Sequence, residues 1–376
     1  MEQKLARAWR EIDLDALTHN ARTLQRALAP GCKLMAVVKA DAYGHGAVPV
    51  ARHLQARGVT GFAVACLSEA VALREAGITG LILILGYTPP EQAPLLVRYG
   101  LTQTVADEAH GLALDAQGLP VPVHLGLDTG MHRLGIPATD RAALTRLYGL
   151  KHLQIRGVFS HLCVADGPSA RDAAFTRAQV ETFFSAVDWL RRHGMDPGET
   201  HIQASAGILN LPPQPCTWAR AGIALYGVTG GCALGQGLDL KPVLSLRARV
   251  ASVRTLEPGQ GAGYGLEFRA GRETRLATVT IGYGDGLPRS LSRQGGAVLL
   301  HGTPCPMAGR MCMDQLLVDV TEVSDTQPGD VVTILGRDGA EAISAAQIAA
   351  QCATIPNELL ARLEPRLPIV AAPFET

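Results

Sequence analysis

A lysine directly follows a run of apolar residues near the N-terminus, in the stretch AVVKADAYGHG at positions 36–46. Burying an ammonium group is costly unless it is paired or neutralised, so Lys39 is unusual at the end of a strand. An uncharged lysine amine there could form a Schiff base with a carbonyl compound. Lys39 could equally lie along apolar neighbours and keep its ammonium in water. Both interpretations remain open from position alone.

The residues after Lys39 form a candidate anion-binding loop. Gly44 and Gly46 predict a tight turn, and the Tyr43 phenol could reach a phosphate group from it. A tyrosine in this position is also a common core residue with a satisfied hydroxyl. Four further polar residues stand at the ends of later apolar runs: Arg133, His161, Ser205 and Arg220.

Eight short apolar runs, rich in β-formers, alternate with helix-period stretches over residues 1–235, and this alternation predicts a (β/α)8 barrel. In that fold the catalytic side chains lie at the carboxyl ends of the strands, where the polar residues above would converge. The loops after the last two strands, with Ser205, Gly222 and Ile223, would hold a phosphate through backbone N–H groups. The predicted strands are 33–38, 62–66, 81–85, 102–105, 121–127, 155–160, 201–205 and 218–222.

The pattern changes after residue 235, where alternating runs separated by Gly- and Pro-containing turns predict a β-rich domain at 236–376. One helix is expected to begin at Ser344, which forms a capping-box pattern with Gln347. The tail from Arg362 onward is expected to have no fixed structure.

Composition excludes several functions. Lys+Arg and Asp+Glu both number 34, which gives no basic surface for nucleic acid or a membrane. Only 18% of residues are charged, so a second copy of the chain is expected to cover part of the surface. The charged N-terminus and the absence of long apolar runs predict a cytoplasmic protein. No HExxH or paired CxxC motif is present, so no metal site is expected.

Seven motifs, taken together, resemble the bacterial alanine racemases in order and approximate spacing over essentially the whole chain. They are AVVKADAYGHG, DTGMHRLG, FSHL, RAGIALYG, GAGYG, IGYGDG and GRMCMDQ. The resemblance implies a barrel enzyme that uses pyridoxal 5'-phosphate (PLP) to interconvert L- and D-alanine and supplies D-alanine for peptidoglycan. It also implies a homodimer in which the C-terminal domain of one subunit completes the active site of the other.

The resemblance also assigns roles to individual residues. Lys39 is similar to the lysine that links to PLP and acts as one base, and Tyr264 to the opposite base, from the partner subunit. His161 resembles the histidine between that tyrosine and an arginine, and Arg220 the arginine facing the pyridine nitrogen. Tyr43, Ser205, Gly222 and Ile223 match cofactor-binding positions, and Arg133, Met313, Tyr283 and Asp314 match substrate-binding ones.

Three positions depart from the family pattern. Many members carry a carbamylated lysine where this chain has Gly126, so no carbamate can form there, and another anion is expected beside a largely buried Arg133. A phosphate-binding tyrosine of some members is replaced here near Pro365. Ala204 stands where an asparagine is frequent beside the phosphate-binding serine.

Three alternatives stay open. A serine/alanine racemase, resembling those attached to membrane segments, would turn over L-serine as well. A barrel-type PLP amino-acid decarboxylase would share two domains, but it is expected to place a glutamate rather than Arg220 against the pyridine nitrogen. A single-barrel PLP carrier protein would share Lys39 but would lack both the second domain and Tyr264.

Overall fold

The computed structural model describes residues 6–229 and 237–372, and it divides into two compact units. The barrel unit comprises Thr18–Ala42 and Ala47–Leu240. The β unit comprises Met1–Leu17, Tyr43–Gly46 and Lys241–Thr376. The domain boundary predicted between residues 235 and 236 falls outside the described residues and stays a prediction.

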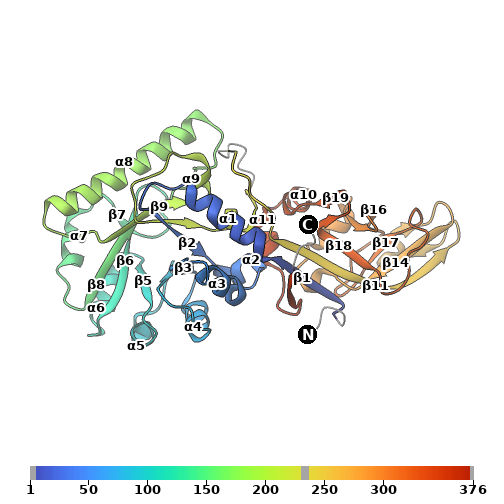
Figure 1. Ribbon diagram of the computed structural model, residues 1–376, viewed down its shortest axis with the longest axis horizontal. Helices are drawn as coiled ribbons and strands as arrows, with labels where there is room; N and C mark the ends of the chain where they lie inside the picture. Colours follow the sequence, from blue (N-terminus) through green and yellow to red (C-terminus); the bar gives the residue numbers. More distant parts are fainter. Residues whose placement is uncertain (1–5, 230–236, 373–376) are drawn as a thin grey trace. The chain divides into compact units, whose positions relative to one another are not determined.

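Eight parallel strands form a closed ring in the barrel unit (Figure 1). The ring closes because β5 pairs with β6 and β10 pairs with β2. Strands such as β3 and β5 are buried along their whole length, as expected where helices cover a parallel sheet. All eight predicted strands are confirmed. They are β2 (Lys33–Val37), β3 (Gly61–Val64), β4 (Leu81–Ile84), β5 (Thr102–Val105), β6 (Val121–Asp128), β8 (Leu153–Phe159), β9 (Glu199–Ala204) and β10 (Trp218–Ala221).

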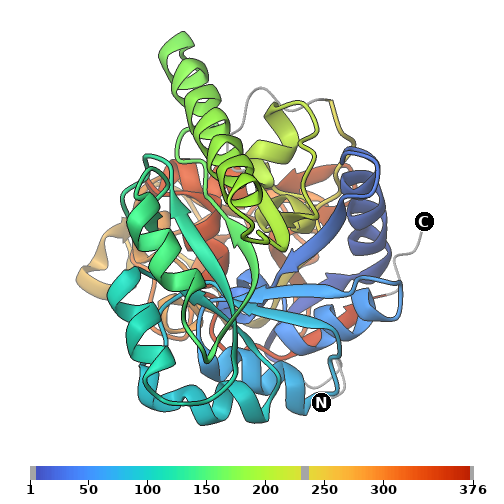
Figure 2. The same ribbon diagram turned by 90° about the vertical axis from the view of Figure 1, so that its left-hand side faces the viewer.

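Helices surround these strands, as the end-on view in Figure 2 shows. The predicted long helix is α8 (Ala170–Arg192), and it begins with a capping box between Ser169 and Asp172. The others are α1 (Leu14–Arg26), α2 (Lys39–Gly44), α3 (Ala47–Gln55), α4 (Leu67–Glu75), α5 (Ala93–Arg98), α6 (Glu108–Asp115), α7 (Arg141–Tyr148) and α9 (Ser205–Asn210), with 3-10 turns η2 (Pro90–Gln92) and η3 (Ile223–Tyr226). A two-residue strand, β7 (Ile136–Pro137), pairs with β6.

The β unit is built on one large sheet with the strand order β16-β15-β18-β11-β1-β20. The long strand β11 (Leu244–Leu256) pairs with β1, β14 and β18, so it organises the unit. The remaining strands are β1 (Ala8–Asp13), β14 (Thr274–Val279), β15 (Ala297–Leu300), β16 (Thr303–Pro306), β17 (Leu316–Asp319), β18 (Val331–Asp338), β19 (Glu341–Ile343) and β20 (Ile369–Ala372).

Short elements complete the β unit. The helix expected at Ser344 is confirmed as α10 (Ala345–Gln351), with the capping box in place. A separate hairpin of β12 (Gly261–Ala262) and β13 (Phe268–Arg269) encloses η4 (Tyr264–Leu266). The others are α11 (Pro356–Ala361), η5 (Tyr283–Asp285) and η6 (Arg289–Arg293).

The prediction of an unstructured tail is wrong for residues 369–372. They form β20, which pairs with β1 in parallel and places Ile369 opposite Arg10. The buried Arg10 side chain also donates to the Leu367 carbonyl from Nε at 3.1 Å. The tail is therefore ordered by the backbone of β1 and by one arginine, neither of which is near it in the sequence.

Candidate active site

Lys39 opens α2, which is a strained left-handed turn at the carboxyl end of β2 rather than one of the outer helices. The four residues after it, 40–43, all have φ between 52° and 55°, although none is glycine. Left-handed backbone costs an L-residue about 1–2 kcal/mol, so other contacts must hold this turn. The Glu69 carboxylate accepts the N–H of Ala40 at 2.6 Å and that of Ala65 at 2.7 Å. Glu69 thus fastens the turn to the end of β3, and strain of this kind is typical of functional sites.

Glycine is required where the turn ends. Gly44 has a φ of +76°, and a Cβ there would lie 2.2 Å from the Leu360 carbonyl oxygen. Tyr43, just before it, is buried, and burial raises the pKa of its phenol to about 12. The hydroxyl therefore stays protonated at neutral pH and can donate a hydrogen bond. Its part in phosphate binding stays a prediction.

The surroundings of Lys39 favour its neutral amine. Burial lowers the pKa of the ammonium, and the positive charges of Arg133 and Arg220 lower it further, while Glu69 opposes them. A lysine amine is nucleophilic only when deprotonated. These neighbours therefore prepare Lys39 for reaction with a carbonyl group.

Arg220 lies on β10 and is only 2% exposed. Its guanidinium donates to the Ser160 carbonyl at 2.7 Å, to Nδ1 of His201 at 2.5 Å and to Nδ1 of His161 at 3.2 Å. Burial lowers its pKa to about 10, so it remains charged at neutral pH. Within the described parts of the chain, its Nε–H has no hydrogen-bond partner, so one fixed donor is left for a ligand atom that can accept.

A chain of buried histidines extends from Arg220 through the barrel. Because an arginine only donates, Nδ1 of His201 must accept, and its Nε2–H must then donate to Nδ1 of His124 at 2.8 Å. The remaining proton of His124 is on Nε2, which lies 3.6 Å from a carboxylate oxygen of Glu199. That separation is longer than a hydrogen bond. Both histidine tautomers are therefore set by the charge of Arg220.

The sequence motifs did not identify this histidine chain. His124 and His201 are each a single histidine inside an apolar strand run, and such a residue is ambiguous between a core side chain and a functional one. Burial and the charge of Arg220 keep the pKa of His201 well below its usual value, so it is neutral. The sequence signal for this histidine chain is the alternation of side chains along β6 and β9, which places His124 and His201 on the same face of the sheet.

His161 is also held neutral. Burial lowers its pKa to about 3, and the positive charges of Arg220, Arg133 and Lys39 add to this. Because Nδ1 of His161 accepts from Arg220, the proton of the neutral imidazole is on Nε2, which can donate a hydrogen bond to a neighbouring oxygen atom. The structure therefore brings together Lys39, His161 and Arg220, as the sequence predicts.

The low pKa of His161 predicts an acid-labile protein. The unfolded histidine takes up a proton below about pH 6.5, whereas the folded one does so only near pH 3. The unfolded state gains protons over that window, so the free energy of unfolding falls as the pH is lowered from 6.5 to 3. We expect His161→Asn to reduce this slope relative to wild type in urea unfolding at several pH values. An unchanged slope would show that His161 is protonated in the folded protein.

Ser205 and the Gly222 turn meet at the carboxyl ends of β9 and β10. The Ser205 hydroxyl accepts the N–H of Gly222 at 3.0 Å and the N–H of Ala224 at 3.2 Å. Two short helical turns, α9 and η3, begin here, and their first N–H groups are the donors that an anion uses. The structure brings Ser205 and Gly222 together, and the role of Ser205, Gly222 and Ile223 in phosphate binding stays a proposal.

Arg133 and Gly126 share a small cavity of about 50 Å³, whose wall also contains His161. The expectation that Arg133 is largely buried is wrong for this chain, since the side chain is exposed. Arg133 forms no ion pair with any residue in the described ranges. The burial cost that required a compensating anion therefore does not apply within the single chain.

Four predicted site residues lie in the β unit, and three of them form one loop cluster. The N–H of Tyr283 donates to the Cys312 carbonyl at 3.1 Å, and that of Gly284 donates to the Met313 carbonyl at 2.8 Å. Arg366 bridges the buried Asp285 carboxylate at 2.7 Å and the Asp314 carboxylate at 2.8 Å. Tyr283, Met313 and Asp314 are therefore brought together.

Tyr264 is on the hairpin of β12 and β13 and is 66% exposed. Glu267, three residues later, forms ion pairs with Arg293 and Arg310. These two arginines hold the pKa of Glu267 at about 2, so the carboxylate stays ionised. Gly265 also packs against the Arg310 guanidinium. The hairpin is fixed at its base while the Tyr264 phenol projects into solvent.

The fold and this site define a class of protein: a parallel (β/α)8 barrel with a half-buried lysine of lowered pKa at a strand end, followed by a β domain. Residues 12–230 match the family model "Alanine racemase, N-terminal domain", and residues 243–371 match "Alanine racemase, C-terminal domain". The chain belongs to the alanine racemase family. Neither of the two family models describes a single-barrel carrier protein or a decarboxylase.

Individual relatives support this assignment. An alanine racemase of Desulfovibrio desulfuricans is 41% identical over 96% of this chain and 97% of its own length. An "Amino-acid racemase" of Enterococcus faecalis is 41% identical over 97% of this chain, which spans only 51% of that relative.

Solved structures of alanine racemases also support the assignment of this chain to the family. The alanine racemase of Clostridium difficile 630 matches with a TM-score of 0.91 and 32% identity, covering 98% of this chain and 96% of that one. That of Bacillus anthracis "with bound L-Ala-P" matches with a TM-score of 0.90 and 33% identity, covering 98% and 95%. In the described part of this chain, no helix combines the length and apolarity needed to cross a membrane.

Proposed function

We propose that this protein interconverts L- and D-alanine with PLP, which Lys39 binds covalently, and that Lys39 and a partner's Tyr264 are the two bases. The observation that carries the proposal is the setting of Lys39: a half-buried amine of lowered pKa, near two arginines, at the end of a barrel strand in a chain of this family. D-alanine formed in this way would supply peptidoglycan. The cytoplasmic location stays a prediction.

The barrel residues fit PLP on two counts. The unpartnered Nε–H of the buried Arg220 is a fixed donor, and the pyridine nitrogen of PLP is an acceptor when unprotonated. Ser205, Gly222 and Ile223 supply a hydroxyl and the starts of two helical turns for the phosphate. When bound, PLP withdraws electrons from the α-carbon of the attached amino acid and makes its proton removable.

Arg220 favours racemisation over side reactions. A guanidinium cannot accept a proton from the ring nitrogen and does not give its own away near neutrality. The histidine chain behind Arg220 reinforces this, because both its tautomers depend on Arg220 remaining a donor. An unprotonated ring withdraws electrons less strongly, so the proton returns quickly to the α-carbon.

Racemisation needs one proton-transferring group on each face of the α-carbon. Lys39 is on the barrel unit and Tyr264 is on the β unit, exposed on a fixed hairpin. We propose a homodimer in which Tyr264 of a second copy faces Lys39, and the Nε2–H of neutral His161 donates a hydrogen bond to that phenol oxygen, which stabilises the phenolate when Tyr264 acts as the base. Arg133 would then bind the substrate carboxylate, while Met313, Tyr283 and Asp314 of the partner copy would line its entrance.

Serine is the second candidate substrate. It is favoured by the 41% identity to a relative described only as an amino-acid racemase, which leaves the amino acid open. The reaction would be the same, and only the space around the substrate side chain would differ.

The proposal is tested by incubating the PLP-loaded protein with pure L-alanine and, separately, pure D-alanine. We expect the optical rotation to decay to zero from both sides, because the two enantiomers have equal free energy in water. L-serine is assayed in parallel to compare kcat/KM. Release of carbon dioxide or accumulation of pyruvate without D-alanine would contradict the proposal.

Gly126 gives a further prediction. A carbamate forms on a lysine amine, and this position has no side chain, so racemisation is expected to be independent of bicarbonate. Activity is measured in buffer freed of carbon dioxide, with and without added bicarbonate, and the Gly126→Lys variant serves as the comparison. Activity that is lost in such buffer and restored by bicarbonate alone would show that another lysine is carbamylated.

A further inference from the structure

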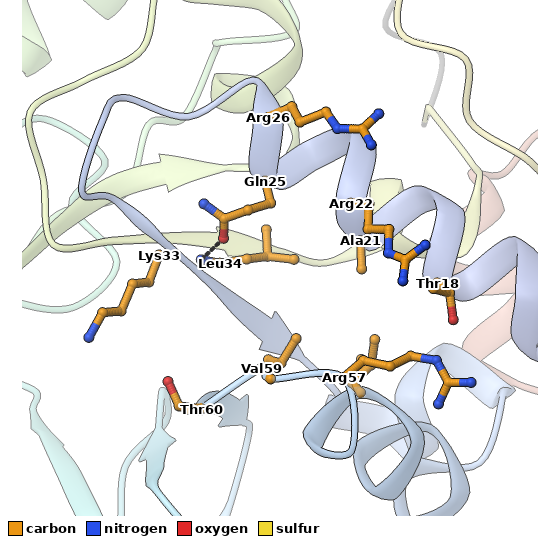
Figure 3. A pocket seen from close by; sticks show the side chains of 12 residues that line it. Thr18, Ala21, Arg22, Gln25, Arg26, Lys33, Leu34, Arg57, Val59 and Thr60 are labelled. Carbon is orange, nitrogen blue, oxygen red and sulfur yellow. Dashed lines mark hydrogen bonds between the residues drawn. The ribbon is translucent and has the colours of Figure 1, made fainter.

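A groove in the barrel unit lies at the other ends of the strands from the candidate active site. It is bounded by α1, by residues 57–60 before β3, and by the first residues of β2 (Figure 3). Its volume is about 490 Å³, which is within the usual range for small-molecule pockets. Conserved barrel chemistry belongs to the carboxyl ends of the strands, so this groove is separate from that site.

The rim of the groove carries positive charge only. Arg22, Arg26, Lys33 and Arg57 line it, and no acidic residue does. None of the four forms an ion pair with a residue in the described ranges. Arg22 and Arg26 are four residues apart on α1, where like charges destabilise a helix. The Lys33 ammonium lies 5.5 Å from the centroid of the Trp218 ring, and Arg57 donates to the His53 carbonyl at 3.3 Å. None of the three arginines has an anionic partner among the described residues.

Figure 3 shows Arg22 and Arg57 extending toward the same end of the groove from opposite walls, with Lys33 at the other end. Gln25 joins α1 to the start of β2, because its amide donates to the Cys32 carbonyl at 2.8 Å and accepts the N–H of Leu34 at 2.9 Å. The backbone positions that carry Arg22, Arg26 and Lys33 are therefore fixed relative to one another.

The floor of the groove is apolar. Val59 is half-buried and supplies the accessible part of this floor, while Ala21, Leu34 and Leu54 are buried beneath it. An apolar floor below a cationic rim fits a ligand with a flat apolar part and a highly charged anionic part. Arginine side chains bind phosphate oxygens in pairs, which favours phosphate as the anion.

We propose that this groove binds a phosphorylated small molecule of the nucleotide type. Its phosphates would lie between Arg22 and Arg57, with Arg26 at the rim, and its ring would lie against Val59. The charge of the ligand would remove the repulsion among the three arginines, which supplies part of the binding free energy.

The test measures ATP binding to the PLP-loaded protein by calorimetry at constant ionic strength, so that the cofactor site is already filled. ATP is expected to bind at least tenfold more tightly than either adenosine or tripolyphosphate. The double variant R22E/R57E should weaken ATP binding at least tenfold. R171E/R177E on α8 is the control with the same charge change, and it should bind as wild type does.

The variant R22Q/R57Q repeats the test if the reversed charges disturb folding, which circular dichroism reports. Absent ATP binding, or equal binding by wild type and R22Q/R57Q, would overturn the proposal. So would loss of ATP binding in Ser205→Ala, because that result would assign the ligand to the cofactor site. Turnover of alanine does not enter these measurements, so they stand independently of the proposed reaction.

Discussion

Replacing Lys39 with alanine is expected to abolish both racemisation and the covalent attachment of PLP. The change removes the amine that links to the cofactor and one of the two proton-transferring groups at once. General acid–base catalysis alone is worth about 10²–10⁴-fold, so the combined loss should leave no measurable turnover. Borohydride reduction followed by peptide mapping is expected to place the pyridoxyl label on Lys39 in the wild type and nowhere in the variant.

Lys151→Ala is the matched control, since Lys151 is an exposed lysine of the same barrel unit. It should retain full activity and the label on Lys39. A label found on a different lysine of the wild-type protein would refute the assignment of Lys39.

Tyr264→Phe is expected to lower kcat by about 10²–10⁴-fold in both directions while PLP binding is unchanged. The equilibrium constant between enantiomers is one, so kcat/KM cannot fall in one direction only. The phenol acts on one face of the α-carbon, so the solvent isotope effects for L- and D-alanine should become unequal. They are measured from initial rates in light and heavy water.

The control for this test is Tyr99→Phe. It removes a phenol of the barrel unit that donates a hydrogen bond to Glu75. That variant should keep wild-type rates. Equal loss in both tyrosine variants would indicate a general structural effect instead of a missing base.

The barrel could be predicted from sequence because its strands are short, separate apolar runs. β3 and β4 are buried on both faces, so each appears as an uninterrupted apolar segment between helical stretches. β20 could not be predicted in this way. Its residues follow a proline near the end of the chain, and only the distant β1 gives them hydrogen-bond partners.

The site was predictable where a residue type is unusual for its position, as with Lys39 and Arg220 at strand ends. The left-handed turn at residues 40–43 was not, because alanine and tyrosine rarely adopt positive φ and one aspartate among them does not indicate four such residues in a row. It depends on the Glu69 carboxylate, which is some thirty residues away. The exposure of Arg133 was also missed, since the sequence does not show where a loop side chain will point.

The central claim, a two-base site shared between two chains, is tested most directly by mixing two inactive proteins. Lys39→Ala and Tyr264→Phe subunits are combined, and formation of mixed dimers is verified with a tag on one of them. Each mixed dimer would contain one site with both bases intact. The account predicts that racemase activity returns in proportion to the fraction of mixed dimers, whereas no activity after proven subunit exchange would contradict it.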